Sequence, residues 1–284
     1  MRYTINMKVL VTGANGYLGQ GIVKALLRRG AEVVAADFKT DHVDERAERK
    51  ECDLFGVSDP FNFFGQPDVL LHLAWRDGFK HDSDAHFEDL PKHYHFIKAF
   101  AEAGVKQIAV MGTMHEIGFY EGCIDESTPC HPTNFYGIAK NALRDFTAEI
   151  CRRHGIAYQW LRGYYIVGNS HFGNSIFSKI TAAAEEGKKE FPFTSGKNKY
   201  DFLDYEEFAD QVAAAATQNK VLGIINICSG KPVSLGERVE RFIAENHYDI
   251  QLKYGAFPDR PYDSKAVWGD GTKIQAILKG ENNG

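Results

Sequence analysis

Near the start of the chain stands the run Met7-Lys8-Val9-Leu10-Val11-Thr12-Gly13-Ala14-Asn15-Gly16-Tyr17-Leu18-Gly19. Its apolar first half predicts a short buried strand, and Gln20 to Arg29 has the periodicity of a helix that Gly30 ends. Glu32 to Asp37 then predicts a second strand that ends in an acid. A strand, a glycine turn, a helix and a second strand in this order form the unit that binds a dinucleotide.

Each glycine of the turn has a separate physical task in that unit. Gly13 permits the tight turn, Gly16 lets the backbone approach a pyrophosphate, and Gly19 allows the helix to pack close to the strand. The free N–H groups and the positive dipole end of the helix then face the phosphates. The expected cofactor-binding residues of the turn are Gly13, Asn15, Gly16, Tyr17, Leu18 and Gly19.

Asp37 bears on which dinucleotide the turn accepts. A carboxylate at the end of the second strand accepts hydrogen bonds from the adenosine ribose hydroxyls and repels a 2′-phosphate. NAD is therefore favoured over NADP. Lys39, two residues further on, partly offsets that repulsion, so NADP remains the weaker alternative.

Strands and helices alternate through the first 162 residues. Further strands are expected at 49–54, 68–74, 105–111 and 156–162, and helices at 87–103, interrupted early by Pro91, and from Thr133 or Asn134 to 155. This alternation predicts an α/β fold with a doubly wound parallel sheet of the Rossmann type. Because ligands lie beyond the carboxyl ends of such strands, Asp53 is expected at the adenine, and Leu73 and Ala74 beside the cofactor.

The pattern loosens beyond Gly163. Loops or turns are expected at 118–132, 168–173 and 191–199, helices at 175–186, 205–217, 234–246 and 272–278, and a strand at 223–228. We therefore expect residues 1–162 to form an NAD-binding core. Residues 163–284 would mainly form a small C-terminal α/β substrate lobe, with segments that return to the core.

Tyr136 and Lys140 are four residues apart in an expected helix, so their side chains share one face. A phenol titrates near ~10, and an ammonium beside it moves its pKa toward neutral pH. The pair can then act as a general acid and base. Thr113, at the end of the fifth strand, can hydrogen-bond a reacting oxygen. The plain alternatives are a surface Tyr and Lys, and a Thr that caps a turn.

These motifs together resemble a known family. Thr12 to Gly19, His72-Leu73-Ala74, Thr113 and Tyr136-x-x-x-Lys140 stand in the order of the extended short-chain dehydrogenase/reductases, most like the nucleotide-sugar epimerases, dehydratases and ketoreductases. Further similar segments are Tyr200 to Asp204, which resembles the family's Arg-Asp-Phe motif, Cys228 to Leu235, and the tail Arg260-Pro261-x-Asp263 with Gly269-Asp270 and Lys273, which is most similar to the sugar 4-ketoreductases.

The resemblance implies roles for individual residues. Tyr136 is the acid/base, Lys140 holds the nicotinamide ribose and lowers the Tyr136 pKa, and Thr113 binds the substrate oxygen. Arg260 is expected to grip a nucleotide diphosphate, because a guanidinium offers paired donors to phosphate. His115 and Tyr165 are expected to contact the substrate. The family also implies a homodimer, in which the helices that hold Phe87 and Tyr136 pair across a two-fold axis.

Three positions depart from the family pattern. Tyr200 stands where Arg is usual before Asp-Phe, and Tyr165 stands where Asn is usual. No Asn lies between His86 and Ala103, where the broader superfamily places one in its proton relay. The first two departures put an ordinary nucleoside-diphosphate sugar in doubt.

The composition narrows the remaining possibilities. The chain has 284 residues, of which 44% are hydrophobic, and a net charge of −5, which leaves no basic footprint for nucleic acid. No apolar run approaches the ~20 residues needed to cross a bilayer, and no signal peptide is evident. Five scattered cysteines suit a reducing cytoplasm. His93 and His95 point to different sides of a helix, so no metal site is expected near them or near His81 and His86.

The favoured hypothesis is an NAD(P)-dependent oxidoreductase that acts on a nucleotide-activated sugar, most simply by 4-keto reduction with Tyr136 as acid/base. An NAD-dependent 4-epimerase is one alternative, favoured by Asp37 because an epimerase retains NAD. A second is a binding module that senses a dinucleotide without chemistry. A third is a reductase of a small non-nucleotide carbonyl, to which Tyr165 and Tyr200 give weight.

Overall fold

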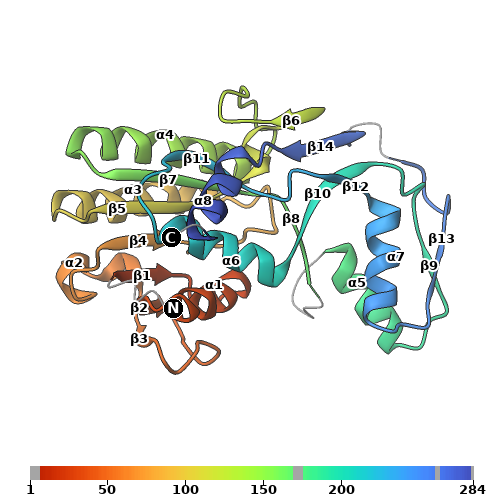
Figure 1. Cartoon of the computed structure of the whole chain (residues 1–284), viewed down its shortest axis with the longest axis horizontal. Coiled ribbons are helices and arrows are strands. Elements are labelled where there is room, and N and C mark those ends of the chain that lie inside the picture. Colours follow the sequence, from red (N-terminus) through yellow and green to blue (C-terminus); the bar gives the residue numbers. More distant parts are fainter. Residues whose placement is uncertain (1–6, 169–174, 260–262, 283–284) are drawn as a thin grey trace.

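A seven-stranded parallel sheet forms the centre of the chain (Figure 1), in the order β11-β7-β5-β4-β1-β2-β3. The computed structural model describes residues 7–168, 175–259 and 263–282. The strands are β1 (Lys8–Thr12), β2 (Glu32–Asp37), β3 (Glu48–Glu51), β4 (Val69–His72), β5 (Gln107–Thr113), β7 (Ala157–Gly163) and β11 (Gly223–Ile227). This arrangement confirms the predicted doubly wound α/β fold.

Helices cover both faces of the sheet, and the sequence of β1 shows why. Val9 and Val11 point to one face and Leu10 to the other, because strand side chains alternate. The helices on the Val9 face are α1 (Tyr17–Arg28), α6 (Tyr205–Ala216) and α8 (Thr272–Asn282). Those on the Leu10 face are α2 (Pro60–Phe63), α3 (Ala85–Glu102) and α4 (Phe135–His154). A parallel sheet buried on both sides reads as continuous apolar strands.

A second, smaller sheet joins strands of the C-terminal part of the chain to β6, and most of its individual strands were not predicted from the sequence. Its order is β12-β10-β14-β6, with β8 paired to β10, and a separate two-stranded sheet joins β13 to β9. The strands are β6 (Gly122–Ile124), β8 (Tyr165–Val167), β9 (Glu190–Pro192), β10 (Lys199–Asp204), β12 (Pro232–Ser234), β13 (Gln251–Lys253) and β14 (Ala266–Gly269). The loop expected at 118–132 and the turn expected at 191–199 therefore contain strands, most of them too short to show a period.

Two helices complete the C-terminal end of the molecule. They are α5 (Ile176–Glu185) and α7 (Leu235–Glu245), which lie with β9 and β13 at the end opposite α2 (Figure 1). Between these two helices the chain returns to the large sheet through α6 and β11. The Tyr205 hydroxyl accepts a hydrogen bond from the Gly21 N–H at 2.9 Å, and any side chain at Gly21 would collide with the Tyr205 ring. This contact fixes α6 against α1.

The ends of α4 are capped as expected, but the expected interruption of α3 is not seen. The Asn134 side chain caps α4 by accepting from the Gly137 N–H at 2.8 Å, and Gly155 ends that helix in the left-handed conformation. The expected interruption at Pro91 is wrong, because α3 continues through it to Glu102. Pro91 stands in the second turn of α3, where only the hydrogen bond to the first turn is lost.

Candidate active site

The strand order reverses between β1 and β4, and the site is built at this point. β2 and β3 extend the sheet on one side of β1, and β4 and β5 on the other. The last residues of the two strands, Thr12 and His72, are opposite each other, and the Thr12 hydroxyl lies 2.8 Å from His72 Nδ1. A crevice at such a switch point is where open α/β sheets bind ligands.

The glycine turn has the shape that a dinucleotide requires. Gly13 has a φ of 69°, and a Cβ there would lie 2.8 Å from the backbone of Ala74. A Cβ on Gly19 would lie 2.2 Å from the Gly13 carbonyl oxygen. Gly16 is the N-cap of α1 and has no side chain to cap it, so the first N–H groups, those of Tyr17 and Leu18, have no side-chain acceptor among the described residues. The turn thus fits a pyrophosphate.

The expected adenosine contacts lie along the same edge. Asp37 ends β2, and its carboxylate accepts from the Asn15 N–H at 3.0 Å and the Phe38 N–H at 2.8 Å. A carboxylate has further lone pairs, so ribose hydroxyls can still bind it. Asp53 is exposed and caps a short 3₁₀ turn through the Phe55 N–H. Leu73 and Ala74 are half-buried directly after β4.

The three expected catalytic residues converge from β5 and α4. Thr113 is the last residue of β5, and its side chain lies near enough to the Tyr136 hydroxyl to favour the phenolate. Tyr136 and Lys140 stand one turn apart on α4. Lys140 is buried, and its Nζ donates to the Met111 carbonyl at 2.8 Å. A hydroxyl, a phenol and an amine therefore gather at the carboxyl edge of the sheet.

The electrostatics of the pair differ from the prediction. Burial raises the Tyr136 pKa to about 12, although the nearby Thr113 side chain favours the phenolate. Burial also lowers the Lys140 pKa to about 7, which the nearby Glu116 carboxylate opposes. The expected lowering of the Tyr136 pKa by Lys140 is thus not seen, because both groups are desolvated and Lys140 points to the Met111 carbonyl and the Trp75 ring.

A loop of residues 75–84, which we call the β4–α3 loop, covers this site. Trp75 places its ring 4.0 Å from Lys140 Nζ, a cation–π contact when the amine is protonated. The Tyr136 N–H donates to the His81 carbonyl at 2.8 Å, so the loop is attached to the first turn of α4. The Trp75 indole N–H donates to His86 Nδ1 at 3.0 Å, and His86 Nε2 lies 2.9 Å from the Lys80 carbonyl.

Buried histidines join the sheet to α3. His72 Nε2 lies 2.8 Å from His93 Nδ1, and His72 Nδ1 faces the Thr12 hydroxyl, which itself accepts from the N–H groups of Leu73 and Ala74. The Thr12 hydroxyl therefore donates to His72, and His72 Nε2–H donates to His93. Burial lowers the pKa of both histidines. His93 is buried and His95 exposed, as their spacing predicted.

A buried ion pair beneath Tyr136 was not predicted. Glu116 and Arg162 are fully buried, and their side chains meet at 2.5 Å, while the Trp160 indole N–H donates to Glu116 at 2.8 Å. The residues lie 46 positions apart, so no local pattern marks the pair. A Glu three residues beyond Thr113, between His115 and Ile117, was the only available signal.

Residues 9–228 of the chain match the model of a protein family described as the NAD dependent epimerase/dehydratase family. The chain belongs to this family. This membership confirms the expected resemblance to the extended short-chain dehydrogenase/reductases. It also confirms that the chain is an enzyme and that its cofactor is NAD.

One curated relative of this epimerase/dehydratase family member matches nearly end to end. The dTDP-6-deoxy-L-talose 4-dehydrogenase (NAD(+)) of Aggregatibacter actinomycetemcomitans is 44% identical over 269 residues, which cover 93% of this chain and 99% of that protein. Two similar solved structures share the fold. A UDP-N-acetylglucosamine 4-epimerase from Methanobrevibacter ruminantium M1 in complex with UDP-N-acetylmuramic acid has a TM-score of 0.82 at 21% identity, and covers 96% of this chain and 92% of its own. A UDP-glucuronic acid 4-epimerase from Bacillus cereus in complex with UDP-glucuronic acid and NAD has a TM-score of 0.79 at 20% identity, with 96% and 93% covered.

The expected substrate residues of this family member fall in different places. His115 lies beside Tyr136, with ring centroids 5.9 Å apart. Tyr165 is on β8, and its ring packs 4.7 Å from that of Tyr200, so the two departures from the family pattern contact each other. Arg260 lies outside the described residues.

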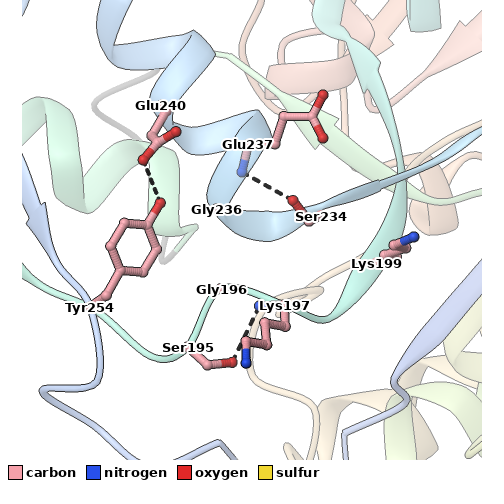
Figure 2. Close-up of a pocket in the computed structure, with 9 residues that line it drawn as sticks. All are labelled: Ser195, Gly196, Lys197, Lys199, Ser234, Gly236, Glu237, Glu240 and Tyr254. Atoms are coloured by element: carbon pink, nitrogen blue, oxygen red, sulfur yellow. Dashed lines mark hydrogen bonds between the residues drawn. The ribbon is translucent and has the colours of Figure 1, made fainter.

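A separate cavity of about 540 Å³ lies in the C-terminal part of the family member (Figure 2). It is lined by Ser195, Gly196, Lys197, Lys199, Ser234, Gly236, Glu237, Glu240 and Tyr254. None of the expected catalytic residues lines it, so it is not the redox site. Within residues 7–168, 175–259 and 263–282, no cluster of His, Cys, Asp and Glu has the arrangement to hold a metal. Over the same ranges, no helix combines the length and apolar character that a bilayer crossing needs.

Proposed function

We propose that this chain interconverts a hydroxyl and a ketone at C4 of a nucleotide-activated sugar, as 4-keto reduction or its reverse, with NAD as the redox partner. The observation that carries the proposal is the convergence of Thr113, at the end of β5, and Tyr136 at the switch point, with Lys140 one turn further along α4. The 44% identical relative is named a dTDP-6-deoxy-L-talose 4-dehydrogenase, so a dTDP-activated 6-deoxyhexose is the first substrate to test.

The residues present fit the chemistry. Thr113 orients the sugar oxygen, and Tyr136 gives a proton to that oxygen or takes one from it. Lys140 would hold the nicotinamide ribose, and the glycine turn with Asp37 would hold the pyrophosphate and the adenosine ribose. Bound NAD supplies the hydride exchange at the sugar carbon, while the protein supplies position and proton transfer.

The division of labour along the chain is part of the proposal. Residues 1–162 would bind the dinucleotide, and residues 163–284 would mainly bind the sugar nucleotide, with β11 and α6 returning to the core. His115 and Tyr165 would contact the substrate, and Arg260 its diphosphate. The paired rings of Tyr165 and Tyr200 support an apolar wall in place of the polar residues usual in the family.

A second candidate is 4-epimerisation. The folds of two solved 4-epimerases match almost the whole chain, and Asp37 suits an enzyme that retains NAD. The two candidates separate in one assay, because an epimerase converts its substrate without added NAD and a dehydrogenase produces one NADH per turnover. A dinucleotide sensor would do neither. A small-carbonyl reductase would gain no thermal stability from any nucleotide sugar.

Assembly and location complete the proposal. Phe87 on α3 and Phe135, Ile138 and Phe146 on α4 are exposed apolar side chains on the paired helices, which supports a homodimer through this face. All five cysteines are free thiols, which supports a reducing cytoplasm.

The test replaces Tyr136 by Phe. We expect turnover of dTDP-6-deoxy-L-talose with NAD to fall by roughly 10²–10⁴-fold, because the acid/base is lost. NAD affinity, measured by titration of protein fluorescence, should stay within about twofold. Retained turnover in Tyr136→Phe would falsify the role of this residue. A wild-type protein inactive on every nucleotide sugar tried would remove the proposed function.

A further inference from the structure

Five histidines lie in or under the site, and they divide into two kinds. His72, His86 and His93 have ring nitrogens in hydrogen bonds to other protein groups. His81 and His115 have only ring contacts, since no acceptor or donor for their imidazole nitrogens is seen in the described part of the chain. These two residues are half-buried, so their nitrogens are available to water or ligand.

The two available imidazoles flank the Tyr136 phenol. The His81 ring stacks on it with centroids 5.4 Å apart and planes 11° apart, and the His115 ring meets it edge-on at 5.9 Å. The His81 and His115 rings are 4.4 Å apart. His81 is held there by its own carbonyl, which accepts the Tyr136 N–H. A bridging water can join polar atoms across separations of this size.

Net oxidation and epimerisation differ in what becomes of one proton. In net oxidation the C4 hydrogen leaves with its electron pair to the nicotinamide dinucleotide, which is reduced, and the hydroxyl proton passes to the Tyr136 oxygen as the C=O bond forms. That proton must leave Tyr136 before the next turnover. In epimerisation the hydride and the proton both return to the same sugar, and no exchange with solvent is needed.

We propose that His115 and His81 form a proton route between the Tyr136 hydroxyl and solvent, which lets the enzyme complete net oxidation or net reduction. In oxidation the Tyr136 O–H bond breaks as an N–H bond forms on His115, and the proton passes through His81 to water. In reduction it travels the opposite way. The proposal rests on the proposed function and adds residues to it.

Burial decides the charge of both rings. It lowers the pKa of His115 to about 4 and also lowers that of His81, so both rings are neutral near pH 7 and would hold the passing proton only transiently. The titratable groups that face them are Tyr136 from α4, His86 from α3, Asp82 beside His81 and Glu116 beside His115. Both nitrogens of His86 are engaged, and Glu116 is bound to Arg162, so neither can relay.

The experiment uses the full chain and the variants His81→Ala and His115→Ala, with His95→Ala as the control. His95 is exposed on the other side of α3. We expect either site variant to lower kcat in both directions by roughly 10²-fold in dilute buffer. Added imidazole should restore it, because a small base can enter the space of the lost ring. His95→Ala should match wild type with and without imidazole.

Rapid mixing with the 4-keto sugar and NADH separates a relay from a structural role. Tyr136 is protonated at neutral pH because burial raises its pKa to about 12, so the first reduction needs no relay. The variants should therefore consume one NADH per site quickly and then turn over slowly. Loss of this burst, or steady-state rates that ignore imidazole, would overturn the route while wild-type turnover keeps the proposed function. An inactive wild type would overturn both.

Discussion

Two segments meet over the carboxyl edge of the sheet, and they are held in opposite ways. The glycine turn, residues 13–19, is shaped by backbone contacts, since side chains at Gly13 or Gly19 would collide with neighbouring main chain. The β4–α3 loop is held largely by side chains: Trp75 donates to His86 and Arg76 to Asp89, beside the main-chain bond from the Tyr136 N–H to the His81 carbonyl. Backbone packing tolerates few residue types, whereas a side-chain network can be changed one contact at a time.

The difference between backbone and side-chain support also decides what each segment can do. A turn fixed by main chain presents N–H groups in one geometry, which suits a phosphate. A loop fixed by side chains can carry titratable groups, and here it brings Trp75 to Lys140 and His81 to Tyr136. Binding of the dinucleotide therefore belongs to the first segment, and control of proton transfer to the second.

The largest effect should come from Gly19→Ala, compared with Gly78→Ala. The new Cβ at Gly19 would lie 2.2 Å from the Gly13 carbonyl oxygen, whereas a Cβ at Gly78 in the β4–α3 loop meets nothing within 4 Å. We expect Gly19→Ala to lower the free energy of unfolding by about 3 kcal/mol and to weaken NAD binding. Gly78→Ala should stay within ~0.5 kcal/mol of wild type. Denaturant unfolding measures both, and equal losses would contradict the comparison.

The sequence predicts the first segment well for a physical reason. The strand, the glycines and the helix are contiguous, so local rules on glycine and helix capping apply directly. The same holds for α4, where Asn134 and Gly155 mark the two ends. The doubly wound parallel sheet follows from the alternation of such units, and the structure confirms it.

Local sequence rules do not predict the contacts of the β4–α3 loop or the strands of the small sheet. Strands such as β6, β8 and β12 have three residues each, too few to display an alternation, and they exist because β10 and β14 supply partners. The pairs His72–His93 and Glu116–Arg162 join residues 21 and 46 positions apart. Nothing in a single sequence shows which of several polar residues will meet in the interior.

A middle-sized effect should appear in the pH dependence of stability of His93→Gln. Burial lowers the His93 pKa to about 3, below its ordinary value of about 6.5 in the unfolded chain. The unfolded state then binds more protons between these values. The histidine's contribution is fully present above pH 6.5 and is lost as the pH falls, at about 1.4 kcal/mol per pH unit.

A glutamine can still accept the His72 N–H, so it removes the titration and keeps the hydrogen bond. We expect the unfolding free energy of His93→Gln to fall less steeply than that of wild type between about pH 6.5 and 5. The exposed His95→Gln is the control and should keep the wild-type slope. If all three proteins share one slope, His93 is not held neutral by its surroundings, and α3 packs less tightly on β4 than the structure indicates.

The smallest effect should come from the outer surface of the β4–α3 loop. Arg76 donates to Asp89 at 2.8 Å and to Glu88 at 3.0 Å, but about half of its side chain is exposed, at 54%. Exposed ion pairs contribute little because water screens them, so Arg76→Ala should cost about 0.5 kcal/mol at low salt and less as salt is added. Lys92 still pairs with Asp89, which leaves that carboxylate a partner. A loss above about 2 kcal/mol, or one that does not respond to salt, would mean that the loop depends on this pair. Loss of one side-chain contact would then destabilise the loop about as much as an added Cβ destabilises the glycine turn. The contrast between backbone and side-chain support would fail.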